Sequence, residues 1–242
     1  MDKTDKNILP NHVAIVPDGN RRWAKAKKYA PWHGHFVGAQ RTEELIRAAF
    51  DAGIYCLSVW GSSRSNLKTR PKMEVRALLK IYEQYFKKLL KSKEIHKNKT
   101  RVNVIGRWPA TLPAHITKII KELIESTKDY NGHLLNLFIA YNGTDEMLAA
   151  IKDIVRAAQK NKQLKITPAL IEKYLWSGGL PPVDFLIRTG SANDPHNSVG
   201  FMMWQAANTQ YYFTNTLYPD FGREEFSKAL DDFVQRQRRF GQ

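Results

Sequence analysis

The chain has 242 residues, of which 43% are apolar, so it can bury one sizeable core, and we predict a single domain across residues 1–242. Its formal net charge of +15 favours anionic partners, which include nucleic acid, an acidic membrane surface and phosphorylated small molecules. The apolar runs are too short to span a bilayer and residues 1–7 lack the apolar centre of a signal peptide, so a cytoplasmic location is expected.

Short apolar runs alternate with longer helical patterns along the chain. The runs predicted as strands are 12–16, 55–60, 101–105, 134–140 and 184–187. This alternation predicts an α/β fold with a central, mostly parallel β-sheet flanked by helices. The single cysteine, Cys56, lies in one of the apolar runs, so we expect it to pack in the core without a disulfide.

Two of the helical patterns have a clear apolar side, which we expect to pack inward. The pattern after Pro71 places on one side Leu78, Ile81, Tyr82, Tyr85 and Leu89. The pattern after Gly143 does the same with Met147, Leu148, Ile151, Ile154 and Val155. The lysine-rich stretch 87–99 lacks aromatic residues on which bases could stack, and we interpret it as a solvated face.

The first cluster that suggests chemistry lies in residues 16–23, where an apolar strand ends, turns at Gly19 and enters a helical pattern. Such a turn directs backbone N–H groups and the positive end of the helix at a ligand beyond the sheet. Arg21 and Arg22 suit phosphate oxygens, and a carboxylate beside a phosphate needs a bridging divalent cation. Asp18 is therefore predicted to be a Mg²⁺ ligand.

Several further motifs follow in order along the chain. They are Asp18-Gly19-Asn20-x-Arg22-Trp23-Ala24-Lys25, Gly34-His35-x-x-Gly38, Ser63-x-x-Asn66-Leu67, Arg70-Pro71-x-x-Glu74, Ile187-Arg188-Thr189-Gly190, Phe201-Met202-Met203-Trp204-Gln205, Pro219-Asp220-Phe221 and Arg236-x-Arg238-Arg239-Phe240-Gly241. Together they resemble the signature of the cis-prenyltransferases, the undecaprenyl diphosphate synthase type of enzyme, over nearly the whole chain. The resemblance implies a homodimeric α/β fold with a parallel sheet and an apolar tunnel for the growing chain.

The resemblance also implies roles for individual residues. The catalytic residues would be Asp18, Asn20, Asn66 and Arg70, with Mg²⁺ held by Asp18 on the allylic diphosphate. The residues that bind this diphosphate or line its entrance would be Gly19, Asn20, Arg21, Arg22, Trp23 and His35. Arg188 and Ser198 would bind the diphosphate of isopentenyl diphosphate, and Asn66 and Arg70 would lie near its isopentenyl unit and assist loss of its proton. Ser63 and His196 are further candidate substrate-binding residues. Asn is a weak base, so Asn66 is expected to position the substrate rather than to accept its proton.

The sequence departs from the family pattern near the allylic site. Arg21 stands where most relatives have Gly, and Pro31 stands where many carry a phosphate-binding Arg. Arg21 and His33 could replace the lost positive charge.

A second group of departures lies near the other diphosphate site. Gln210 replaces the family's usual Glu, a metal-linked carboxylate supplied by the second subunit, and brings no charge to a Mg²⁺ site. The segment 191–200 is longer than usual and lacks the expected Arg before Ser198. His196 could substitute for that Arg, and Asp194 for the missing carboxylate.

Ionising an allylic diphosphate separates an anionic leaving group from a delocalised cation. Cations and N–H dipoles stabilise the leaving group, and an apolar pocket keeps water away from the delocalised cation. We predict a Mg²⁺-dependent prenyltransferase that condenses isopentenyl diphosphate with an allylic prenyl diphosphate to give a (Z)-polyprenyl diphosphate. The alternatives are a non-head-to-tail condensation and a non-catalytic partner subunit. The expected partners are a second copy of the chain and, for product release, the membrane surface. Nucleic acid is not expected, because its recognition signatures are absent.

Overall fold

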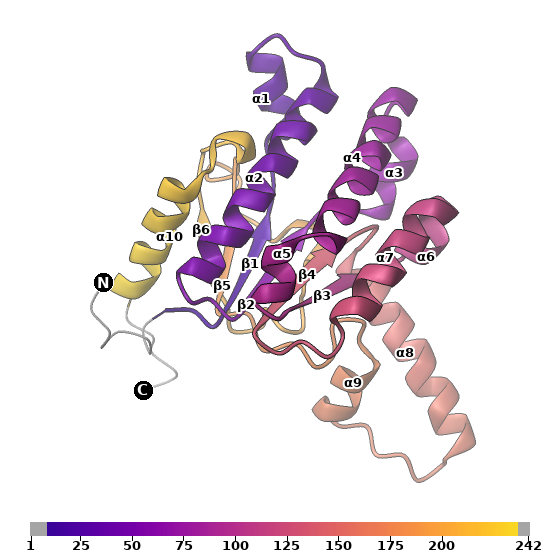
Figure 1. Ribbon diagram of the computed structural model, residues 1–242. Coiled ribbons are helices and arrows are strands. Elements are labelled where there is room, and N and C mark those ends of the chain that lie inside the picture. The colour runs from indigo at the N-terminus through magenta and orange to yellow at the C-terminus, as the bar shows by residue number, and fades with distance from the viewer. Residues whose placement is uncertain (1–8, 237–242) are drawn as a thin grey trace.

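The computed structural model describes residues 9–236, and in this part of the chain six strands form one sheet (Figure 1). The strands are β1 (His12–Val16), β2 (Cys56–Trp60), β3 (Thr100–Ile105), β4 (His133–Phe138), β5 (Phe185–Arg188) and β6 (Gln210–Phe213). Their order is β3-β4-β2-β1-β5-β6, and every neighbouring pair is parallel. The α/β fold with a parallel sheet is thereby confirmed, whereas the edge strand β6 was not predicted.

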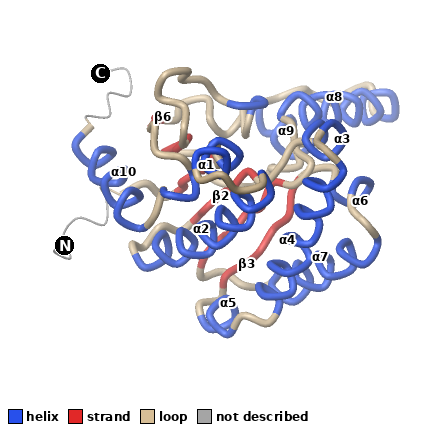
Figure 2. Tube along the Cα trace, turned by 90° about the horizontal axis from the view of Figure 1, so that it is seen from above, coloured by secondary structure: helices blue, strands red, loops and turns tan. Residues whose placement is uncertain are grey.

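The helices lie between the strands in the chain. They are α1 (Asn20–Ala26), α2 (Pro31–Asp51), α3 (Arg64–Thr69), α4 (Lys72–Leu90), α5 (Lys93–Lys97), α6 (Trp108–Thr111), α7 (Ala114–Thr127), α8 (Gly143–Lys160), α9 (Pro168–Tyr174) and α10 (Arg223–Gln235). Seen from above, α8 and α9 lie across the sheet from α2, α4 and α7 (Figure 2). No helix in residues 9–236 is long and apolar enough to cross a membrane.

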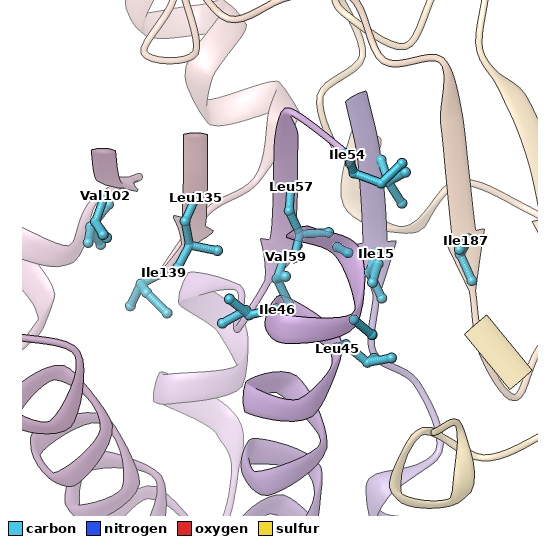
Figure 3. Close-up of a cluster of buried hydrophobic side chains, with 14 of the residues drawn as sticks. Ile15, Leu45, Ile46, Ile54, Leu57, Val59, Val102, Leu135, Ile139 and Ile187 are labelled. Atoms are coloured by element: carbon cyan, nitrogen blue, oxygen red, sulfur yellow. The ribbon is translucent and has the colours of Figure 1, made fainter. Parts of the chain in front are cut away.

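One face of the sheet carries the larger core, which packs against α2, α4, α7 and α10. Successive residues of a strand point to opposite faces, so Val13 and Ile15 of β1 belong to this core while Ala14 does not. From α2, Leu45 and Ile46 reach toward the same strands (Figure 3). The predicted apolar side of α4 also faces inward, with Leu78, Ile81 and Tyr82 buried.

The other face of the sheet is covered chiefly by loop segments. Its core contains Ala14 and Val16 of β1 together with Phe201 and Met202 from the loop after β5. A buried histidine, His12, also lies here, with Nδ1 2.8 Å from the carbonyl oxygen of Pro181 and Nε2 2.8 Å from the Ser58 hydroxyl. The loop segments are thus attached to the sheet by hydrogen bonds as well as by apolar contacts.

The prediction that α8 packs all its apolar residues inward was wrong. Ile154 is buried, but Leu148, Ile151 and Val155 are 48%, 55% and 51% exposed. The α8 stripe, as we call these three exposed residues, follows the expected helical spacing, but nothing in residues 9–236 covers it. Periodicity shows that a helix has an apolar side, but it does not show what packs against that side.

The strand order reverses at β1, because β1 and β5 lie side by side while the connections that follow them lead to opposite sides of the sheet. After β1 the chain runs to β2 on one side, and after β5 it runs to β6 on the other. In open parallel sheets, ligands bind outside the carboxyl ends of the strands at such a point. The ends of β1 and β5 are therefore where the fold favours a site.

Burial lowers the pKa of His12 from 6.5 to about 4, so the folded protein keeps this ring neutral while the unfolded chain takes up a proton below pH 6.5. Folding stability should therefore be complete above pH 6.5 and decline as the pH falls toward 4. The free energy of unfolding, measured by urea titration, should fall less steeply between pH 7 and pH 4.5 in His12→Gln than in the wild type. The difference in slope should be up to about 1.4 kcal/mol per pH unit. The exposed His115→Gln variant is the control, and equal slopes in all three proteins would contradict this account.

Candidate active site

Asp18 follows β1, and its carboxylate is held between two guanidinium groups. Oδ1 accepts a hydrogen bond from Nη2 of Arg22, and Oδ2 accepts one from Nη2 of Arg188, each at 3.0 Å. The Thr189 hydroxyl accepts from the Asp18 N–H at 2.9 Å and donates to its carbonyl oxygen at 2.8 Å. Because Val16 of β1 is paired with Arg188 of β5, the sheet itself brings these groups together at its carboxyl edge.

The turn after Asp18 needs glycine. Gly19 has a φ of 103°, and a Cβ atom there would lie 2.7 Å from the Leu217 side chain. The chain then enters α1 at Asn20, whose buried side-chain oxygen has no hydrogen-bond partner among the described residues. A Cβ atom on Gly38 of α2 would lie 2.5 Å from that oxygen, so the glycine leaves room for the amide.

These groups open into a polar cavity of about 860 Å³. The predicted site residues that line this polar cavity are Asp18, Gly19, Asn20, Arg21, Arg22, His35, Asn66, Arg70 and Ser198. Lys25 and Lys28 also contribute to its wall. The cavity therefore contains one carboxylate among several cationic groups, an arrangement suited to an anionic ligand.

The predicted substrate-binding residues that lie outside the lining of the polar cavity are Trp23, Ser63, Arg188 and His196. Two of them, Trp23 and Ser63, act in the local structure. The Trp23 ring is buried and donates from Nε1 to Oδ1 of Asp220 at 2.8 Å. Ser63 caps α3, because its hydroxyl accepts from the Asn66 N–H at 3.0 Å while Oδ1 of Asn66 accepts from the Ser63 N–H at 3.2 Å. The cap fixes the position of Asn66 at the cavity wall.

Arg188 is 7% exposed, and Nη1 donates to the backbone carbonyl of His196 at 2.7 Å. The His196 ring instead faces Asp194, with Nδ1 3.2 Å from Oδ1, and neither residue lines the polar cavity. The Nε atom of Arg188 is buried without a hydrogen-bond partner among the described residues. The segment 191–200 thus supports Arg188 through its backbone.

Gln210 does not reach Asp18 within one chain. It begins β6 and pairs with Phe185, while Arg188 and the site lie at the other end of β5. A contribution from a second subunit stays a prediction. The end motif after Arg236 falls in residues 237–241, outside the described residues.

Glu74 is a site residue to which the sequence analysis gave no role. It is 1% exposed, and Oε1 lies 2.9 Å from Nε2 of His35 and 3.1 Å from Nη1 of Arg70. Nη1 of Arg70 is also 2.9 Å from that His35 nitrogen. Burial lowers the pKa of His35, an effect that Glu74 opposes, so the ring is neutral near pH 7. The sequence signal for it was the motif Arg70-Pro71-x-x-Glu74, which places Glu74 in the first turn of α4, four residues after Arg70.

An apolar cavity of about 510 Å³ adjoins the polar one. Both cavities include in their walls Pro17, Asn20, His35, Trp60 and Arg70. From there the apolar cavity runs between α2, α4 and the sheet past Ile46, Phe50, Leu78, Ile81, Tyr82, Phe86, Leu137 and Ile139. It reaches Thr100, the first residue of β3, at the opposite edge of the sheet.

The donor set fits a metal ion only in combination with a ligand. Among residues 9–236, no group of three His, Cys, Asp or Glu side chains could hold a metal. Mg²⁺, however, is often bound by one or two carboxylates together with substrate phosphates. Asp18 is partly exposed in the polar cavity and offers one such carboxylate.

Comparison with known proteins identifies the family. A sequence model described as "Putative undecaprenyl diphosphate synthase" matches residues 16–241. A "Tritrans,polycis-undecaprenyl-diphosphate synthase (geranylgeranyl-diphosphate specific)" of Pyrococcus abyssi is 38% identical, over 100% of this chain and 90% of the relative. An "Isoprenyl transferase" of Aquifex pyrophilus is 37% identical, over 96% of each chain.

Solved structures agree with this assignment. The lavandulyl diphosphate synthase of Lavandula x intermedia, in complex with dimethylallyl diphosphate, has a TM-score of 0.88 and 30% identity over 98% of this chain and 100% of its own. A probable undecaprenyl diphosphate synthase of Campylobacter jejuni has a TM-score of 0.74 and 26% identity over 96% and 99%. This chain therefore belongs to the undecaprenyl diphosphate synthase family and is a prenyltransferase of the cis-prenyltransferase type.

Proposed function

We propose that this chain condenses isopentenyl diphosphate with an allylic prenyl diphosphate, in the presence of Mg²⁺, to give a (Z)-polyprenyl diphosphate. The observation that carries the proposal is the junction of the two cavities at Asn20, His35 and Arg70. A prenyl diphosphate has an anionic head and an apolar tail, and each part matches one cavity. The tail gains free energy by leaving water, at about 0.8 kcal/mol for each buried CH₂ group.

In this proposal the allylic diphosphate lies in the polar cavity. Asn20 and Arg22 bind its oxygens, and the buried, unpartnered amide oxygen of Asn20 acquires a role in ordering bound water or metal. When bound, Mg²⁺ on Asp18 supplies charge stabilisation to the leaving diphosphate. Arg22 and Arg188, which neutralise Asp18 in the free protein, can then turn toward phosphate.

Isopentenyl diphosphate lies on the β5 side of the same cavity. Arg188 has a buried Nε–H without a partner among residues 9–236, and Ser198 lines the cavity wall. Arg70 and Asn66 face the space between the two substrates and hold the reacting carbon atoms in place. The departing diphosphate is the base for the proton lost at the end, since Asn66 is too weak a base.

The relatives suggest two kinds of substrate. The relatives from Pyrococcus abyssi and Methanocaldococcus jannaschii are named as geranylgeranyl-diphosphate specific, whereas the lavandulyl diphosphate synthase structure contains dimethylallyl diphosphate. Because the chain is structurally similar to lavandulyl diphosphate synthase, a non-head-to-tail condensation is the second candidate function.

A substrate test separates these functions. The purified protein is incubated with Mg²⁺ and geranylgeranyl diphosphate plus isopentenyl diphosphate, or with dimethylallyl diphosphate alone, and the products are analysed by mass spectrometry. Long polyprenyl products in the first reaction support the proposal. Products in the second reaction alone support the second candidate, and no product in either supports a non-catalytic partner subunit.

We also propose a homodimer with α8 at the interface. The α8 stripe places Leu148, Ile151 and Val155 in solvent on one helix, and contiguous exposed apolar side chains of this kind mark association surfaces. A second copy of the chain would cover the stripe and could bring Gln210 toward the site of its partner.

Replacement of Asp18 by Asn keeps one of the two acceptor oxygens that Arg22 and Arg188 use, puts an NH₂ group in place of the other, and removes the charge that would bind Mg²⁺. We expect turnover to fall by about 10²-fold or more, in line with the loss of one strong electrostatic contact in an active site. The Mg²⁺ concentration for half-maximal rate should rise as well. Asp129→Asn, at an exposed position, is the control. Unchanged turnover at low Mg²⁺ would exclude Asp18 as a metal ligand.

Replacement of Ile151 by Asp places a charge in the centre of the α8 stripe, where burial would leave it unpaired. Sedimentation velocity should show mainly monomers at a concentration at which the wild type is dimeric. Lys152→Asp, one position away, controls for the charge itself. A dimer of normal stability in Ile151→Asp would move the interface elsewhere.

A further inference from the structure

The corner between α1 and α2 exposes three aromatic side chains. Tyr29 is 52% exposed, Trp32 38% and Phe36 40%, and we call these residues the aromatic tip. Trp32 and Phe36 are four residues apart in α2 and therefore share one side of that helix. Figure 1 shows the turn between α1 and α2 at the top of the molecule, beyond the ends of the strands.

The chain segment that carries the aromatic tip has charged side chains of one sign only, although Asp220 accepts a hydrogen bond from the neighbouring Trp23. Residues 19–42 contain no Asp or Glu, and Lys25, Lys27 and Lys28 are all exposed. No ion pair joins any of these lysines to a carboxylate in the described part of the chain. Lys27 instead places Nζ 5.3 Å from the centre of the Trp23 ring.

The polar cavity accounts for only part of this surface. Lys25, Lys28 and Tyr29 contribute to its wall, so a diphosphate ligand gives them a role. Trp32, Phe36 and Lys27 line neither of the two cavities. Exposed aromatic side chains in a segment with lysines that have no carboxylate partner suit a surface that is both apolar and anionic.

We propose that the aromatic tip docks on the surface of a membrane that contains anionic phospholipids. Trp and Tyr favour the boundary between headgroups and acyl chains, where their rings meet hydrocarbon. Exposed lysines are attracted to anionic headgroups, each strengthening binding several-fold at low salt, while their stems lie along the apolar boundary. Neither aromatic insertion nor electrostatic attraction alone holds a protein firmly on a bilayer, and the aromatic tip with its lysines combines both.

This docking would place the mouth of the polar cavity at the bilayer surface, because Lys28 and Tyr29 belong to both the cavity wall and the tip region. The inference rests on the proposed function in one respect only. If the substrate is a prenyl diphosphate, its head would lie at the same depth as the mouth while its tail is still in the membrane. Lipid binding itself requires no turnover.

The test is co-sedimentation of the full-length protein with vesicles of phosphatidylcholine alone or mixed with phosphatidylglycerol, without substrate. Wild type should bind the anionic vesicles at least tenfold more strongly than the neutral ones, and less as NaCl is raised. Trp32→Gln with Phe36→Gln, and separately Lys27→Glu, should each weaken anionic binding about tenfold. The control is Ile166→Gln with Val234→Gln, which removes exposed apolar side chains elsewhere and should bind as the wild type does.

Three results would overturn the proposal. One is that the wild type and the tip variants bind the anionic vesicles equally well. Another is that the control variant loses as much vesicle binding as the tip variants do. The third is a change of oligomeric state in the Trp32→Gln and Phe36→Gln protein, which would assign the tip to contact between copies. Circular dichroism melts show that each variant is folded. Turnover with a short, soluble allylic substrate should be unchanged in the tip variants, and absence of turnover in wild type would refute the proposed function while leaving the lipid result valid.

Discussion

The ion pair between Asp18 and Arg188 is the contact on which the candidate site depends, because it joins the ends of two neighbouring strands that lie 170 residues apart in the chain. Arg188 is almost fully buried, and a buried guanidinium without a counter-charge is strongly destabilising. Asp18 supplies that charge and the His196 carbonyl supplies a second acceptor. The free protein therefore holds its cations in place before an anionic ligand arrives, and binding needs little rearrangement.

A second set of polar contacts lies where the polar and apolar cavities meet. Glu74 of α4 contacts His35 of α2 and Arg70, the residue that follows α3. The helices α2 and α4 form walls of the apolar cavity. The buried carboxylate offsets the positive charge of Arg70 and keeps both side chains at the cavity boundary. In the proposed reaction this boundary separates the carbon skeleton from the diphosphate, so the polar head cannot slide into the apolar region without breaking these contacts.

The sequence predicted the strands to within one or two residues wherever an aliphatic run is buried in the sheet, as at β1 and β2. It missed β6, an edge strand whose four residues are all half-buried and which begins with Gln210. The motifs predicted most of the polar cavity wall, because these residues lie at strand ends and helix starts. They did not show that Ser63 is a helix cap, that Trp23 bonds to Asp220, or that the α8 stripe is exposed. These facts depend on side-chain direction and on neighbours distant in sequence, neither of which local spacing encodes.

The great sequence separation of the site residues also has a consequence for the folding of the chain. Pairing β5 with β1 brings together residues that are 170 positions apart, as Asp18 and Arg188 are, and closing so long a loop carries an entropic cost. Of the two guanidinium groups that face Asp18, Arg22 is four residues away in the chain, whereas Arg188 reaches Asp18 only when β5 pairs with β1. A chain that lacks this strand pairing has no complete anion site. Under the proposed function, a prenyl diphosphate that binds only the chain with β5 paired to β1 would stabilise the folded protein by mass action. It would thereby also slow proteolysis that proceeds through unfolding.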